Sequence, residues 1–113
     1  MARVGVNLLV RNIPDMPLQL RATQFAVQSL LDSDLCLTDW RLQIVDDASP
    51  CEETRRYLVS LRGWPGRRVY VWRNEEQLGI ARGRNRGNQF FAENWQPDYV
   101  VEMHTDHIFP QEW

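Results

Sequence analysis

The sequence has no lysine, and all 13 of its basic residues are arginine. Chemistry that depends on a catalytic or phosphate-binding lysine is therefore excluded. Long apolar runs are also absent, so no segment is predicted to cross a membrane or to act as a signal peptide. The two cysteines, Cys36 and Cys51, form neither a close-spaced ligand pattern nor a disulfide framework. These absences predict a cytoplasmic protein with reduced thiols.

The length and the composition predict a single soluble domain. The 113 residues are enough for one hydrophobic core, and 43% of them are apolar and 25% charged, as in ordinary globular proteins. The net charge of −2 argues against general binding of nucleic acid or of anionic membranes.

The most informative stretch is an apolar run that ends in two adjacent carboxylates. Residues 42–45 are short, rich in branched side chains and flanked by polar groups, which is typical of a buried strand. Asp46 and Asp47 follow directly. Ser49 then stands three residues before Glu52, with proline between them, and this spacing predicts a capping box at the start of a helix. In an open α/β sheet such a corner lies at the carboxyl edge, where ligands bind.

The rest of the chain repeats this order of strand, polar corner and helix. It predicts an α/β fold with right-handed crossovers and a mostly parallel sheet. An N-cap is expected at Asp15 and a helix-terminating glycine at Gly63. The expected strands are 4–10, 40–45, 68–73 and 98–103. The first expected helix ends near residue 32, the second covers 50–62 and the third covers 80–94.

The apolar spacing also predicts which helix faces meet the core. Two glycines on the third helix would cost about 1 kcal/mol each relative to alanine, which indicates close approach to the sheet. The predicted core faces are Leu18, Ala22, Phe25, Ala26 and Leu30 in the first helix, Leu58 and Leu61 in the second, and Ile80, Gly83, Gly87 and Phe90 in the third.

The strand ends carry the residues that predict function. Because the carboxyl ends of parallel strands meet at one edge, these side chains should share a crevice. Carboxylates, amides and a basic helix there are typical of a site for a metal-bridged phosphate ligand. The residues are Asn12, Asp46, Asp47, Arg73, Asn74, His104 and Asp106.

These motifs together resemble those of glycosyltransferase family 2. They are Val45-Asp46-Asp47-Ala48-Ser49, then Asn74, then Leu78-Gly79-Ile80-Ala81, and then Arg84-Asn85-Arg86-Gly87. The resemblance covers nearly the whole chain, in the family's order. It implies the Rossmann-like, nucleotide-binding half of a GT-A fold, with about four strands and three helices. On this basis the chain is expected to be the amino-terminal part of a longer glycosyltransferase domain.

The resemblance also implies roles for seven residues. Asp47 would hydrogen-bond the nucleotide base, with support from Asp46, while Asn12 would line the base and ribose. Arg84 and Asn85 would face the diphosphate. Asp106 matches the second aspartate of the family's Asp-x-Asp motif and would hold a divalent metal, Mn²⁺ or Mg²⁺. His104 stands in place of the first aspartate, and an imidazole suits Mn²⁺ better than Mg²⁺.

The implied function is to bind a nucleotide-diphosphate sugar, first of all a UDP-sugar, for transfer to an acceptor that the sequence does not identify. The general base is expected beyond Trp113, so the 113 residues alone are expected to be inactive. A non-catalytic nucleotide-sugar or protein-binding module of the same fold is the alternative. Phospho-acceptor signalling domains and sugar nucleotidyltransferases are disfavoured because both need a lysine.

One further expectation concerns the last strand. It is expected to leave unpaired backbone groups beside Tyr99, Val101 and Met103, and such an edge is a template for association. The sequence therefore predicts self-association through this edge.

Overall fold

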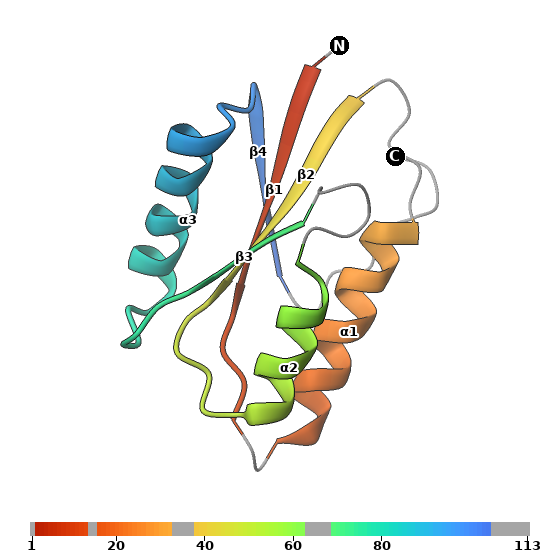
Figure 1. Ribbon diagram of the computed structural model, residues 1–113, viewed down its shortest axis with the longest axis vertical. Helices are drawn as coiled ribbons and strands as arrows, with labels where there is room; N and C mark the ends of the chain where they lie inside the picture. Colours follow the sequence, from red (N-terminus) through yellow and green to blue (C-terminus); the bar gives the residue numbers. More distant parts are fainter. Residues whose placement is uncertain (1, 14–15, 33–37, 63–68, 105–113) are drawn as a thin grey trace.

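A computed structural model of the protein describes residues 2–13, 16–32, 38–62 and 69–104. In this part of the chain four parallel strands and three helices alternate, which confirms the predicted α/β class (Figure 1). The elements are β1 (Ala2–Val10), α1 (Pro17–Asp32), β2 (Thr38–Asp46), α2 (Glu52–Ser60), β3 (Val69–Arg73), α3 (Ile80–Asn94) and β4 (Tyr99–Met103).

The sheet has the strand order β3-β2-β1-β4, and each neighbouring pair is parallel. Helices α1 and α2 cover one face and α3 covers the other (Figure 1). The central strands β1 and β2 therefore have helices on both of their faces. No helix in the described ranges is both long enough and apolar enough to span a membrane.

The hydrophobic core lies mainly between the sheet and the pair α1 and α2. Burial of the apolar side chains in this core is the main favourable contribution to folding. The buried residues of this cluster are Val6, Leu8, Val10, Ala26, Val27, Leu30, Trp40, Leu42, Ile44, Leu58, Val69 and Met103. Leu61 packs against the cluster and is half-buried, so the predicted core face of α2 is confirmed.

The predicted core face of α1 was partly wrong. Leu18 and Phe25 are 72% and 70% exposed, although Ala26 and Leu30 are fully buried as expected. The buried stripe instead follows Thr23, Ala26, Val27 and Leu30, which is the regular i, i+3, i+4, i+7 spacing. The hydroxyl of Thr23 made this stripe look polar in the sequence.

The predicted capping box of α2 was also wrong. The helix begins at Glu52, two residues later than Pro50, and its N-cap residue Cys51 makes no side-chain cap hydrogen bond. The Ser49 hydroxyl instead accepts a hydrogen bond from the Asn12 backbone amide at 2.9 Å. Ser49 therefore joins the end of β1 to the corner after β2. The expected positions of Asp15 and Gly63 lie outside the described residues.

Helix α3 has the predicted bounds, and its close approach to the sheet is confirmed. A Cβ atom on Gly83 would lie 2.6 Å from Leu9 Cδ1, and one on Gly87 would lie 2.4 Å from Asn7 Oδ1. The buried stripe is completed by Phe91 rather than by the predicted Phe90.

The predicted placement of Ile80 on the core face of α3 was wrong. It is 69% exposed and lies at the rim of the carboxyl edge, in the first turn of the helix. The helix packs on the sheet only from Gly83 onward, so its first turn projects past the strand ends.

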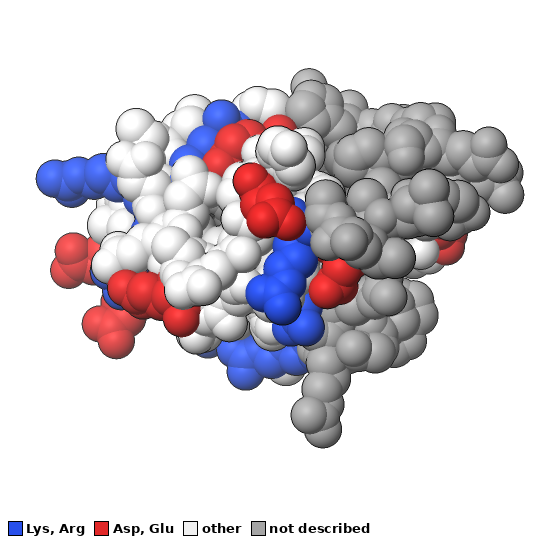
Figure 2. Space-filling model, turned by 90° about the horizontal axis from the view of Figure 1, so that it is seen from above, with Lys and Arg blue, Asp and Glu red and all other residues white. Residues whose placement is uncertain are grey.

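Strand β4 ends the sheet beyond β1 in the described part of the chain. Tyr99 and Val100 are exposed and Met103 is buried. The expected self-association through this strand stays a prediction. Figure 2 views the molecule from the amino ends of the strands and shows acidic and basic side chains interspersed with uncharged surface.

Candidate functional site

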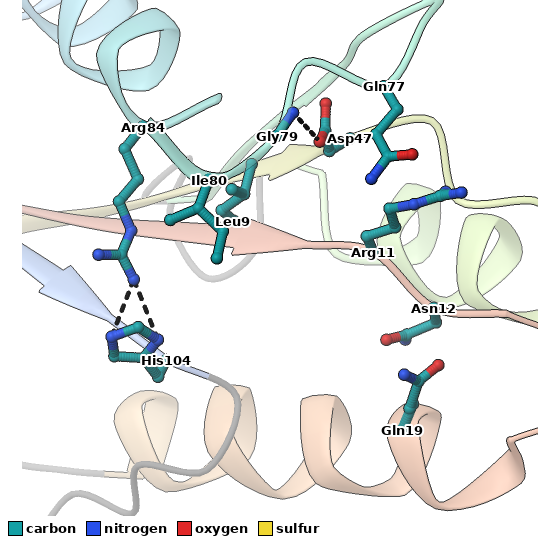
Figure 3. Close-up of a pocket in the computed structure, with 10 residues that line it drawn as sticks. All are labelled: Leu9, Arg11, Asn12, Gln19, Asp47, Gln77, Gly79, Ile80, Arg84 and His104. Atoms are coloured by element: carbon teal, nitrogen blue, oxygen red, sulfur yellow. Dashed lines mark hydrogen bonds between the residues drawn. The ribbon is translucent and has the colours of Figure 1, made fainter. Parts of the chain in front are cut away.

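A cavity of about 240 Å³ opens at the carboxyl edge of the sheet. Its walls come from the ends of β1 and β4, the first turn of α1, the corner after β2 and the start of α3 (Figure 3). The cavity lies at the strand ends, where the sequence predicts the site; that the site is functional stays a prediction. The lining residues are Leu9, Arg11, Asn12, Gln19, Asp47, Gln77, Gly79, Ile80, Arg84 and His104.

Asp46 lies beneath the cavity and organises the corner after β2. Its Oδ2 atom is 2.6 Å from Arg73 Nη1, and its Oδ1 atom accepts a hydrogen bond from the Ser49 backbone amide at 2.9 Å. The Arg73 guanidinium also donates to the Ser49 carbonyl at 3.2 Å. The Asp46 side chain is buried and is not among the residues that line the cavity, so its contacts are those of a supporting residue.

Asp47 is buried and holds the loop that leads into α3. Its Oδ1 atom accepts hydrogen bonds from Asn74 Nδ2 at 2.9 Å and from the Leu78 amide at 2.8 Å. Its Oδ2 atom accepts one from the Gly79 amide at 3.0 Å (Figure 3). A carboxylate has about four acceptor positions, so three internal donors leave room for one more. Asp47 can therefore support the loop and still accept a hydrogen bond from a ligand.

The environment of Asp47 keeps its carboxylate ionised. Burial alone would raise its pKa, but the hydrogen bonds from Leu78, Asn74 and Gly79 and the positive charge of Arg11 act in the opposite direction. The net result is a pKa below the ordinary value of 3.8. At neutral pH this side chain is an acceptor only.

Asn12 is buried at the end of β1 and lines the cavity. Its amide nitrogen donates to Thr23 Oγ1 at 3.2 Å and to Thr54 Oγ1 at 3.0 Å. These contacts tie β1 to both α1 and α2. They also fix the orientation of the amide, so its oxygen is the atom that can accept a hydrogen bond from a ligand.

Arg84 reaches the cavity from α3 and meets the end of β4. Its Nη2 atom lies 3.0 Å from Nδ1 and 2.9 Å from Nε2 of His104 (Figure 3). Of the three alternating arginines of α3, it is Arg84 that lines this cavity, while Arg82 is exposed and Arg86 lies 5.1 Å from the ring centre of Phe90. Alternating residues of a helix point in different directions, so the three arginines do not face one site.

Asn85 is not brought into the cavity with Arg84. It is exposed on α3, because consecutive helix residues point about 100° apart. Asp106 lies outside the described residues. Among the side chains that the structure describes, no three His, Cys, Asp or Glu residues come together as a metal site.

Three polar residues of the cavity were not predicted from the sequence: Arg11, Gln19 and Gln77. Arg11 adds a second guanidinium to that of Arg84. Its position directly before Asn12, at a strand end, could have predicted it as a residue of the site. Gln19 and Gln77 depend on where α1 begins and how the loop before α3 turns. The cavity thus combines two cations with amide and carboxylate oxygens, which suits a polar, anionic ligand.

The sequence profile of glycosyl transferase family 2 matches residues 22–113. The fold is of the GT-A kind. The chain belongs to glycosyltransferase family 2. A comparison with curated proteins finds no significant match.

Solved structures with a similar fold are GT-A glycosyltransferases. The structure of S. aureus TarS 1-349 in complex with UDP has a TM-score of 0.72 and 18% identity, covering 97% of this chain and 29% of that one. The mannosyltransferase PcManGT from Pyrobaculum calidifontis, in complex with GDP-Man and Mn²⁺, has a TM-score of 0.75 and 17% identity, with 96% and 29% covered. GalNAc-T7 with UDP, GalNAc and Mn²⁺ has a TM-score of 0.66 and 16% identity, with 93% and 18% covered. The chain therefore spans less than a third of each of these proteins.

Proposed function

We propose that the chain binds the nucleoside diphosphate of a nucleotide sugar in this cavity and so forms the donor-binding part of a glycosyltransferase. One observation carries the proposal: three separate elements, the end of β1, the corner after β2 and helix α3, bring Asn12, Asp47 and the guanidinium of Arg84 to the same cavity. Acceptor oxygens suit a nucleobase or ribose, and a guanidinium suits phosphate oxygens.

The two kinds of group favour one orientation of the ligand. Asp47 has one acceptor position left after its three internal hydrogen bonds, and the N–H of a uracil or guanine ring can fill it. Arg84 stands at the β4 side of the cavity, where the diphosphate would lie. Asn85 is exposed, so we assign it at most an indirect role. The UDP complex of TarS and the GDP-Man complex of PcManGT are consistent with either base, and UDP is the first ligand to test.

A divalent metal is the proposed cofactor, held by Asp106 with His104. The position of His104 in the cavity wall fits this role, and Mn²⁺ accompanies the ligands of PcManGT and GalNAc-T7. When bound, a metal would neutralise charge on the diphosphate. Both ring nitrogens of His104 lie against Arg84 Nη2, so ligation by His104 requires the guanidinium to move.

The residues assigned to the cavity include neither a binding site for the acceptor nor a general base. Asp47 is the one carboxylate among the described residues that line the cavity, and three donors already occupy it. A base must be able to take a proton from the acceptor hydroxyl. We therefore propose that the chain's own contribution is to bind and orient the donor.

Binding is tested with the chain itself by titration calorimetry. We expect UDP to bind, and Arg84→Gln to weaken binding by roughly tenfold because a charge-assisted contact to phosphate is lost. Arg82→Gln, an exposed position on the same helix, is the matched control and should leave the affinity unchanged. Folded protein that binds neither UDP nor GDP at millimolar concentration would refute the proposed function.

The metal is tested in the same titration with Mn²⁺ or Mg²⁺ present. Because an imidazole ligand favours Mn²⁺, we expect Mn²⁺ to raise the UDP affinity more than Mg²⁺ does. Asp106→Asn should remove most of this dependence. Equal enhancement by the two ions, or none by either, would contradict the assignment of Asp106 and His104.

A further inference from the structure

A row of polar side chains runs across the sheet beneath α3. Asn7 of β1 pairs in register with Gln43 of β2 on one side and with Glu102 of β4 on the other. Asn7 and Gln43 are fully buried, and Glu102 is half-buried. Three polar residues side by side in the middle of parallel strands are unusual, since such strands are normally apolar throughout.

The hydrogen bonds along this row all run in one direction. The indole N–H of Trp72 donates to Gln43 Oε1 at 3.0 Å, and Gln43 Nε2 donates to Asn7 Oδ1 at 3.3 Å. Asn7 Nδ2 then donates to both carboxylate oxygens of Glu102, at 3.2 and 3.4 Å. Trp72 can only donate and an ionised Glu102 can only accept, so the ends of the row fix both amide orientations.

The row continues from Glu102 to the cavity through Arg84. Arg84 Nε is buried and makes no hydrogen bond to any residue that the structure describes, yet it lies 3.8 Å from Glu102 Oε2. The far end of the same guanidinium, Nη2, stands in the cavity wall beside His104 (Figure 3). The carboxylate therefore faces the inner end of the guanidinium and leaves the outer end for the cavity.

We infer that Glu102 is a positioning residue for Arg84, which orients the guanidinium toward the diphosphate of the ligand. The inference rests on the proposed function for the identity of that ligand. Glu102 does not line the cavity, so it acts on the ligand through Arg84 alone. The buried amides of Asn7 and Gln43 hold Glu102 in turn, which makes the placement of Arg84 a property of the sheet rather than of a loop.

The experiment compares UDP with uridine, which lacks the phosphates. In Glu102→Gln the amide oxygen can still accept from Asn7, but the charge that attracts Arg84 is gone. For a partly buried ion pair we expect a roughly fivefold loss of UDP affinity and no change for uridine. In an Arg84→Gln background, Glu102→Gln should have no further effect. Equal losses for both ligands, or in both backgrounds, would show a merely structural role and overturn the inference.

Two further measurements keep the test decisive. Glu93→Gln makes the same chemical change at an exposed position of α3, where Glu93 accepts from Gln89 at 3.0 Å, and it should alter neither affinity.

In the wild-type protein without nucleotide, the Nε–H proton of Arg84 should exchange slowly by NMR, because it is buried against Glu102. Exchange as fast as in free arginine would overturn the inference even if UDP binds. Slow exchange without UDP binding would refute the proposed function alone.

Discussion

Replacing Gly87 by alanine is expected to lower the free energy of unfolding by about 2 kcal/mol, although helix propensity alone would raise it by about 1 kcal/mol. The added Cβ would lie 2.4 Å from Asn7 Oδ1 and 2.6 Å from Asn7 Nδ2. Asn7 cannot move aside without breaking its hydrogen bonds to Gln43 and Glu102. Chemical denaturation of both proteins measures the difference.

The matched control is the same substitution one turn earlier. An alanine Cβ at Gly83 would meet only the methyl groups of Leu9, at 2.6 and 2.9 Å, and the half-buried Leu9 side chain can rotate away. We expect Gly83→Ala to be close to neutral, since the propensity gain offsets the contact. If Gly87→Ala proved as stable as the wild type, the polar row would not be rigid.

Replacing Asp47 by alanine is expected to cost about 3 kcal/mol of stability, the largest effect predicted for a single residue of the site. Asn74 Nδ2 and the amides of Leu78 and Gly79 would lose their acceptor together. Because two of these donors belong to the backbone, hydrogen exchange at Leu78 and Gly79 should speed up along with the loss measured by denaturation. Unchanged exchange at both amides would show that the loop is held by other contacts.

The contribution of Asp47 should also depend on pH. Its folded-state pKa lies below its ordinary value of 3.8, so the stabilisation is fully present above that value and is lost as the pH falls through the folded-state pKa. The stability difference between the wild type and Asp47→Asn should therefore be constant near neutral pH and shrink below about pH 4. A difference that stayed constant down to the acid transition would contradict the ionised carboxylate.

The order of the elements was predictable because it depends on local patterns. Apolar strands that are each followed by a polar loop and a helix predict parallel strands joined by crossovers. This arrangement brings Asn12, Asp47 and His104 to one edge of the sheet, whatever the details of packing. The buried face of α1 was harder to predict. Thr23 can be buried because its hydroxyl donates to the Gln19 carbonyl and accepts from Asn12 Nδ2. The sequence alone does not show that these two hydrogen bonds form.

The internal hydrogen bonds of the site were not predictable for the same reason. Ser49 has the spacing of a helix cap, yet its hydroxyl accepts a hydrogen bond from the backbone amide of Asn12, which is far away in the chain. The family resemblance distinguished Asp47 from its supporting neighbour Asp46, but the sequence did not show the contacts of either carboxylate. Asp46 turns inward to Arg73, and Asp47 turns toward the loop before α3.

The one-way row from Trp72 to Glu102 has a consequence for how the strands align during folding. Parallel strands are joined by long crossovers, so no tight turn dictates which residue of one strand faces which residue of the next. A slip of two residues would keep every side chain on its proper face. It would, however, set Asn7 opposite Arg41 or Val45 of β2 in place of Gln43, and so break the amide pairing and leave buried amides unpaired. The alignment of Asn7 with both Gln43 and Glu102 thus destabilises sheets with shifted strands. It selects one strand register, where the burial of apolar side chains alone would not distinguish among several.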